Sequence, residues 1–65
     1  MANDSNIMSA KRAQYLRALR DRGPLKMRKA DKRQRDWAVK WEYVETESSI
    51  ERITDKGRLQ LYRHG

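Results

Sequence analysis

The chain has 65 residues, with 16 Lys and Arg against 9 Asp and Glu, a formal net charge of +7 and no cysteine. These values exclude a second domain within these residues and any disulfide or thiolate metal site that would reinforce a small fold. We therefore expect stability to come from a partner subunit or from a small hydrophobic core built on the leucines and on Tyr15, Trp37, Trp41, Tyr43 and Tyr62.

The N-terminal segment is polar. Residues 1–14 lack the basic start and apolar stretch of a signal peptide, and no apolar run approaches the roughly 20 residues that a membrane-spanning helix needs. We expect a cytoplasmic protein without membrane contact. Residues 1–8 are predicted to be a flexible segment, and residues 9–63 to form a single domain.

The first predicted element is a helix that begins after Ser9 and ends at Gly23. Residues 10–22 are rich in Ala, Leu, Arg and Gln, which favour helix, and Ser is a preferred N-cap residue. Gly23 suits the position after a helix, and Pro24 cannot continue one. Four apolar residues share one side of this helix or its start: Met8, Tyr15, Leu16 and Leu19.

Residues 24–41 are predicted to be mostly helical, because Pro24 fits the first turn of a helix. Asp31 is also a candidate N-cap, which would divide the region into a short helix and a longer one. We expect helix to about Trp41 and a strand from Tyr43. On a helical wheel, one face carries Met27, Ala30, Gln34, Trp37, Ala38 and Trp41, and the opposite arc carries Arg28, Lys29, Lys32 and Arg35.

The C-terminal part is predicted to contain two short strands, at residues 43–45 and 50–53, around a polar turn. The segment that follows has two interpretations. Residues 55–57 fit a hairpin loop with Gly57 in a left-handed conformation. Alternatively, Thr54 caps a helix, in which Gly57 would cost about 1 kcal/mol relative to Ala. Local physical chemistry leaves the two nearly balanced.

Three segments resemble winged helix-turn-helix regulators, in the order of that family. The sequence YLRALRDRGPL at residues 15–25 is similar to their first helix and its Gly-Pro-Leu junction. WEYVE at 41–45 resembles the end of their recognition helix, and IERITDKGRLQLY at 50–62 resembles their second wing strand and a Thr-x-x-Gly helix start. The resemblance implies an α+β fold with a short two-stranded wing and a C-terminal helix, and it favours Thr54 as a cap.

The middle region is shorter than the family pattern. Leu25 to Trp41 offers 17 residues, so the second helix is expected to be very short or fused with the third. The wing is minimal and carries Glu47 where the family often has Arg or Lys, which argues against wing contact with the minor groove. C-terminal helices of the family often pair, so the resemblance also implies a homodimer seam at Leu59 and Tyr62.

Positive charge is concentrated in the first part of the chain. Residues 1–41 carry 12 basic and 4 acidic side chains, whereas residues 42–65 carry 4 and 5. Such asymmetry favours an anionic partner, most often nucleic acid. Arg and Lys reach phosphates, and Arg also pairs with guanine edges. The candidate contact residues are Arg28, Lys29, Lys32, Arg33 and Arg35 in the middle region, and Arg12, Arg17 and Arg20, with Lys11, on the first helix.

Enzymatic chemistry has little to build on. His64 is the only histidine, and the chain has no cysteine nucleophile, glycine-rich phosphate loop or metal-ligand spacing. We expect no enzyme activity, metal or cofactor. The sequence predicts a small transcriptional regulator that binds double-stranded DNA. The alternative is a phage or mobile-element protein that binds and inhibits a host protein through the same basic face, and RNA binding is a third hypothesis.

Overall fold

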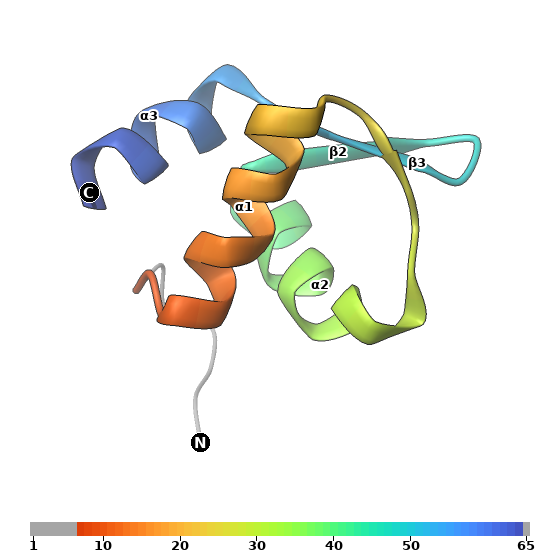
Figure 1. The fold of residues 1–65 in the computed structure, drawn as a ribbon, viewed down its shortest axis with the longest axis horizontal. Coiled ribbons are helices and arrows are strands. Elements are labelled where there is room, and N and C mark those ends of the chain that lie inside the picture. Colours follow the sequence, from red (N-terminus) through yellow and green to blue (C-terminus); the bar gives the residue numbers. More distant parts are fainter. Residues whose placement is uncertain (1–6, 65) are drawn as a thin grey trace.

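The computed structural model describes residues 7–64 as a small α+β domain (Figure 1). Three strands form an antiparallel sheet in the order β1-β3-β2. No helix in this range has the length and apolar character needed to cross a membrane. The elements in chain order are α1 (Ala10–Arg22), β1 (Leu25–Lys26), the 3₁₀ turn η1 (Lys29–Asp31), α2 (Lys32–Lys40), β2 (Val44–Glu47), β3 (Ile50–Ile53) and α3 (Asp55–His64).

Both predicted ends of the first helix are confirmed. The Ser9 hydroxyl accepts a hydrogen bond from the backbone N–H of Arg12 at 3.2 Å. At the other end Gly23 has a φ of 83° and donates its N–H to the carbonyl of Leu19 at 3.0 Å. Residues 1–6 of the predicted flexible segment lie outside the described residues, whereas Met8 packs against the core.

The predicted helix over residues 24–41 is wrong in its first part. Leu25 and Lys26 pair with β3 instead, so the predicted two-stranded wing is a three-stranded sheet. The N–H of Met27 also donates to the carbonyl of Ser49 at 2.9 Å. Proline disfavours helical conformation in the residue before it and is tolerated in the first turn of a helix, so Pro24 permits either a helix or a strand next. The backbone groups along β3 decide in favour of the strand.

Helical structure begins only at η1, and α2 starts at Lys32, with Asp31 in the N-cap position. Asp31 thus holds the N-cap position that the alternative interpretation gave it, but its side chain makes no capping hydrogen bond, and only the 3₁₀ turn η1 stands in place of the short helix expected before it. Because the segment before η1 is not helical, the predicted apolar face does not extend to Met27 and Ala30, which are exposed.

The hairpin turn consists of Ser48 and Ser49 alone, because Thr46 and Glu47 belong to β2. Both serines have positive φ, 52° and 66°. Two left-handed residues form the tight turn that matches the twist of paired strands. The turn fixes the register that pairs β2 with β3, and the hairpin projects from the body of the domain (Figure 1).

The helical interpretation of the C-terminal segment is confirmed. The Thr54 hydroxyl accepts from the N–H of Gly57 at 3.0 Å and donates to the carbonyl of Glu42 at 2.7 Å. Gly57 is buried against the backbone, where a Cβ atom would collide with the carbonyl oxygen of Tyr43. Glycine is therefore required here for close approach of α3 to the end of α2 and the start of β2.

The core lies between α1, α2, α3 and the sheet. The Trp37 and Tyr43 rings meet edge to face, with centroids 5.2 Å apart. Trp41 is only half-buried, and Tyr62 is 81% exposed, so its predicted place in the core is wrong. Leu59 is also exposed, and the homodimer seam stays a prediction. The buried apolar residues are Ala13, Tyr15, Leu16, Leu19, Trp37, Ala38, Tyr43, Val44, Ile53 and Leu61.

Candidate nucleic-acid interface

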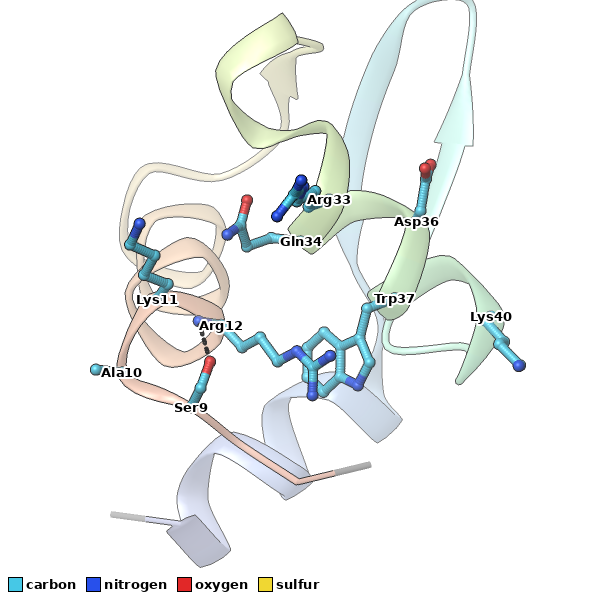
Figure 2. Close-up of a pocket in the computed structure, with 9 residues that line it drawn as sticks. All are labelled: Ser9, Ala10, Lys11, Arg12, Arg33, Gln34, Asp36, Trp37 and Lys40. Carbon is cyan, nitrogen blue, oxygen red and sulfur yellow. Dashed lines mark hydrogen bonds between the residues drawn. The ribbon is translucent and has the colours of Figure 1, made fainter. Parts of the chain in front are cut away.

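A groove runs between α1 and the segment formed by β1, η1 and α2. It consists of two hollows of about 780 and about 580 Å³, and Lys11 and Gln34 line both of them. The first hollow opens between the N-terminal turn of α1 and α2, with Trp37 on its floor (Figure 2). The second continues along α1 toward β1. We call the two hollows together the α1–α2 groove.

The lining of the α1–α2 groove is strongly basic. Its cations are Lys11, Arg12, Arg17, Arg22, Lys26, Arg28, Arg33 and Lys40. Its carboxylates are Asp21, Asp31, Asp36 and Glu51. Eight cations against four carboxylates put more than half of the net charge of the chain on one concave surface. Concave charged surfaces focus the electric field and raise the local concentration of oppositely charged ligands.

The nine predicted contact residues fall into three groups. Five line the α1–α2 groove: Lys11, Arg12, Arg17, Arg28 and Arg33. Lys29, Lys32 and Arg20 lie exposed outside its lining. Arg35 alone points inward. The structure thus brings five of the nine together and places the others beside the groove, on the outer side of α2, or inside the fold.

Arg35 belongs to a buried polar network that joins three elements. Its Nη1 donates to Oε2 of Glu51 at 3.1 Å and to the carbonyl of Arg28 at 3.0 Å. The Tyr15 hydroxyl donates to Oε1 of Glu51 at 2.6 Å. Burial, and then this hydrogen bond, raise the pKa of Tyr15 well above its ordinary value. Glu51 is only 2% exposed, so the network ties α2 to β3 and α1.

The predicted place of Arg35 on the solvent-facing arc of the helix is therefore wrong. Its side chain is 14% exposed and is held by Glu51, which occupies an inward position on β3. A buried carboxylate needs a paired cation and further hydrogen bonds, and Arg35 is the cation within reach. The role of this side chain is to position α2, and its guanidinium is already engaged.

Arg12 has a mixed role in the groove. Its guanidinium carbon lies 4.5 Å from the centroid of the Trp37 ring, over the ring face (Figure 2). Its Nη1 also donates to the carbonyl of Ile7 at 2.8 Å. Cation–π contacts of this kind are worth about 0.5–2 kcal/mol. Arg12 therefore covers the floor of the first hollow and contributes charge to its wall.

Two exposed ion pairs flank the groove. Lys32 donates to Asp36 at 2.8 Å across one turn of α2, and this hydrogen bond lowers the pKa of Asp36. Arg20 donates to Asp21 at 2.8 Å, which lowers the pKa of Asp21 in the same way. In both pairs a cation outside the groove lining neutralises a carboxylate within it.

Sequence reasoning misplaced Gln34, which the helical wheel assigned to the core side. The residue is half-buried, but it lines both hollows. Trp37 and Ala38 are the residues of α2 buried in the core, whereas the space beside Gln34 between α1 and α2 stays open. Arg22, Lys26 and Lys40 also line the groove without having been predicted. Their positive charge is the one feature of the sequence that indicates a role in binding an anionic partner.

The hairpin has a different character. Glu45 and Glu47 are exposed on β2, and with Ser48, Ile50 and Arg52 they line a separate hollow of about 210 Å³. Within residues 7–64, no group of three or more His, Cys, Asp or Glu side chains is arranged to hold a metal ion. The basic surface therefore belongs to α1, η1 and α2, and the hairpin does not extend it.

Comparison with known proteins gives no match. No protein-family model matches the chain, and no significant similarity is found to a curated protein or to a solved structure. The resemblance to winged helix-turn-helix regulators therefore stays a prediction.

Proposed function

We propose that the protein binds double-stranded DNA through the exposed side of α2 and the α1–α2 groove, as a transcriptional regulator of winged-helix type. The observation that carries this proposal is the gathering of eight cations in one groove beside a helix that is itself exposed and basic. Phosphate contacts from such residues position a protein on DNA, and base contacts from a helix provide specificity.

The dimensions of α2 support this mode of binding. An α-helix with its side chains is about 10–12 Å in diameter, and the major groove, about 12 Å wide, admits such a helix; the nine residues of α2 would lie along about 13 Å of it. The exposed side of α2 carries Lys32, Arg33, Asp36, Val39 and Lys40. Arg28, an exposed arginine just before η1, has the fork geometry that pairs with a guanine, while Lys32 and Arg33 would approach phosphates.

The order of the elements supports the winged-helix part of the proposal. A helix, a short strand, a helical turn, a second helix and a hairpin follow one another, and a third helix closes the domain. The turn η1 stands where the family has a full second helix. Because Glu45 and Glu47 would be repelled by phosphates, we assign DNA contact to α1, η1 and α2, without the hairpin.

The proposal is tested by titrating a fluorescent duplex of random sequence at two salt concentrations. We expect binding at about 50 mM NaCl that weakens at about 200 mM, with a slope of about −0.9 in log K against log salt for each phosphate contact. Lys29→Ala should reduce this slope by about one unit. Arg63→Ala removes the same charge from α3 and should leave the slope unchanged. Absence of duplex binding at low salt would refute the proposal.

An acidic protein surface is the second candidate partner. The exposed acids Glu45 and Glu47 on the hairpin favour it. A folded protein can present an acidic patch to the groove and neutral or basic residues to the hairpin, whereas DNA is negative along its whole length. Competition against the labelled duplex separates the two, with unlabelled duplex and poly-glutamate compared at equal charge. We expect the duplex to compete far better. Equal competition by poly-glutamate would favour the protein partner.

A further inference from the structure

Three side chains meet at the centre of the α1–α2 groove. Lys11 projects from α1, and Arg33 and Gln34 project from α2 across the first hollow from it (Figure 2). Lys11 and Gln34 also line the second hollow. Two cations and a primary amide from two different helices therefore face one shared space.

These three side chains have no partner within the described part of the chain: no hydrogen bond or ion pair among residues 7–64 engages the side chain of Lys11, Arg33 or Gln34. Gln34 is nevertheless half-buried, so its amide has given up part of its contact with water. A half-buried amide without a protein partner retains two N–H donors for a ligand.

The carboxylates of the groove do not neutralise this centre, because each has a cation of its own. Asp21 is paired with Arg20 at 2.8 Å and Asp36 with Lys32 at 2.8 Å, and both cations lie outside the lining. Glu51 is paired with the inward-pointing Arg35 at 3.1 Å. The remaining pair is Asp31 with Arg28 at 3.7 Å. The positive charge of Lys11 and Arg33 is thus left for a ligand.

We propose that the centre of the α1–α2 groove binds a backbone phosphate of the DNA, with Lys11 and Arg33 supplying charge and Gln34 donating to a phosphate oxygen. The inference rests on the proposed function and adds the path of one strand, which runs along the groove beside α2. Gln34 is set back between the two helices, so a strand passing beside α2 reaches it more readily than a base edge in front of α2. Glutamine amides commonly donate to phosphate oxygens.

The decisive variant is Gln34→Glu, which keeps the shape of the side chain and replaces its donors with a negative charge. The matched control is Gln60→Glu on α3, outside the groove lining, which changes the net charge by the same amount. At about 50 mM NaCl we expect Gln34→Glu to weaken duplex binding about tenfold or more, since loss of a charge-assisted contact and new repulsion add. The control should stay within about twofold.

Two further variants distinguish loss of a DNA contact from loss of folding. Gln34→Ala removes the donors without adding charge and should weaken binding about threefold, and Lys11→Gln should reduce the salt slope by about one unit. Circular dichroism establishes that each variant is folded. If the wild type binds DNA but Gln34→Glu and Gln60→Glu weaken it equally, the phosphate site is refuted and the outer side of α2 carries the contact. If the wild type does not bind, the proposed function itself fails.

Discussion

Glu51 is the residue whose role is least visible in the sequence. It lies between Ile50 and Arg52 in a four-residue strand, and the alternation places it on the same face as Ile53, toward the core. A carboxylate at such a position is unfavourable unless it is paired. The partners come from residues distant in sequence, Tyr15 and Arg35. No local pattern could have indicated that Arg35 turns inward.

The Tyr15 hydroxyl makes this network sensitive to alkaline pH. The raised pKa of Tyr15 means that the fold favours its neutral, donating form. The stabilisation is therefore fully present below the ordinary tyrosine pKa of about 10 and is lost as the pH rises above it. The Tyr15→Phe variant has no hydroxyl to ionise and provides the reference, because all other titrating groups are shared.

We predict that the difference in unfolding free energy between wild type and Tyr15→Phe shrinks as the pH rises from about 9.5 to about 11.5, by at most about 1.4 kcal/mol per pH unit. Urea unfolding followed by tryptophan fluorescence at each pH measures it. Parallel pH curves for the two proteins would show that the hydroxyl is not held in its neutral form.

At the scale of elements, the caps could be predicted from the sequence and the strand pairing could not. Ser9, Gly23 and Thr54 act on backbone groups within three or four residues, so local chemistry identifies them. By contrast, β1 exists because Leu25 faces Glu51 across the sheet. A strand of two residues is too short to show an alternating pattern, so the sequence does not indicate its pairing with a distant strand. Pro24 was equally compatible with a helix.

In the candidate site, too, the features set by local sequence could be predicted and those set by packing could not. Charge counting located the basic part of the chain, and helical periodicity placed Lys32 on an exposed side. It could not place Gln34, because a helical wheel gives direction but not the distance to the neighbouring helix. The opening between α1 and α2 depends on how two packed helices diverge, which is a property of the whole core.

Helix α3 owes its position to a close backbone approach at Gly57. We predict that Gly57→Ala destabilises the domain by about 1–3 kcal/mol, although alanine favours helix by about 1 kcal/mol. The added Cβ would collide with the carbonyl of Tyr43 and lie 2.9 Å from Cγ1 of Ile53. The control Gln60→Ala in the same helix should change stability by about 0.5 kcal/mol or less. A Gly57→Ala variant as stable as the wild type would contradict the packing of α3 described above.

For the whole molecule, the asymmetric charge has opposite consequences for folding and for binding. The domain measures 29 × 25 × 17 Å, so at low ionic strength its cations lie within a few Debye lengths of one another. Repulsion among them opposes the compact state, while the same field attracts a polyanion. Added salt weakens both effects, and it should therefore stabilise the fold while it weakens binding to DNA.

We predict that the urea midpoint rises when NaCl increases from about 20 to about 300 mM, as the Debye length falls from about 20 to about 6 Å. The groove is the main source of the repulsion, so Lys11→Gln should stabilise the domain at low salt more than Arg63→Gln, which removes the same charge from α3. The difference between the two variants should diminish as salt is added. A midpoint that falls with salt would mean that exposed ion pairs such as Lys32–Asp36 outweigh the repulsion within the α1–α2 groove.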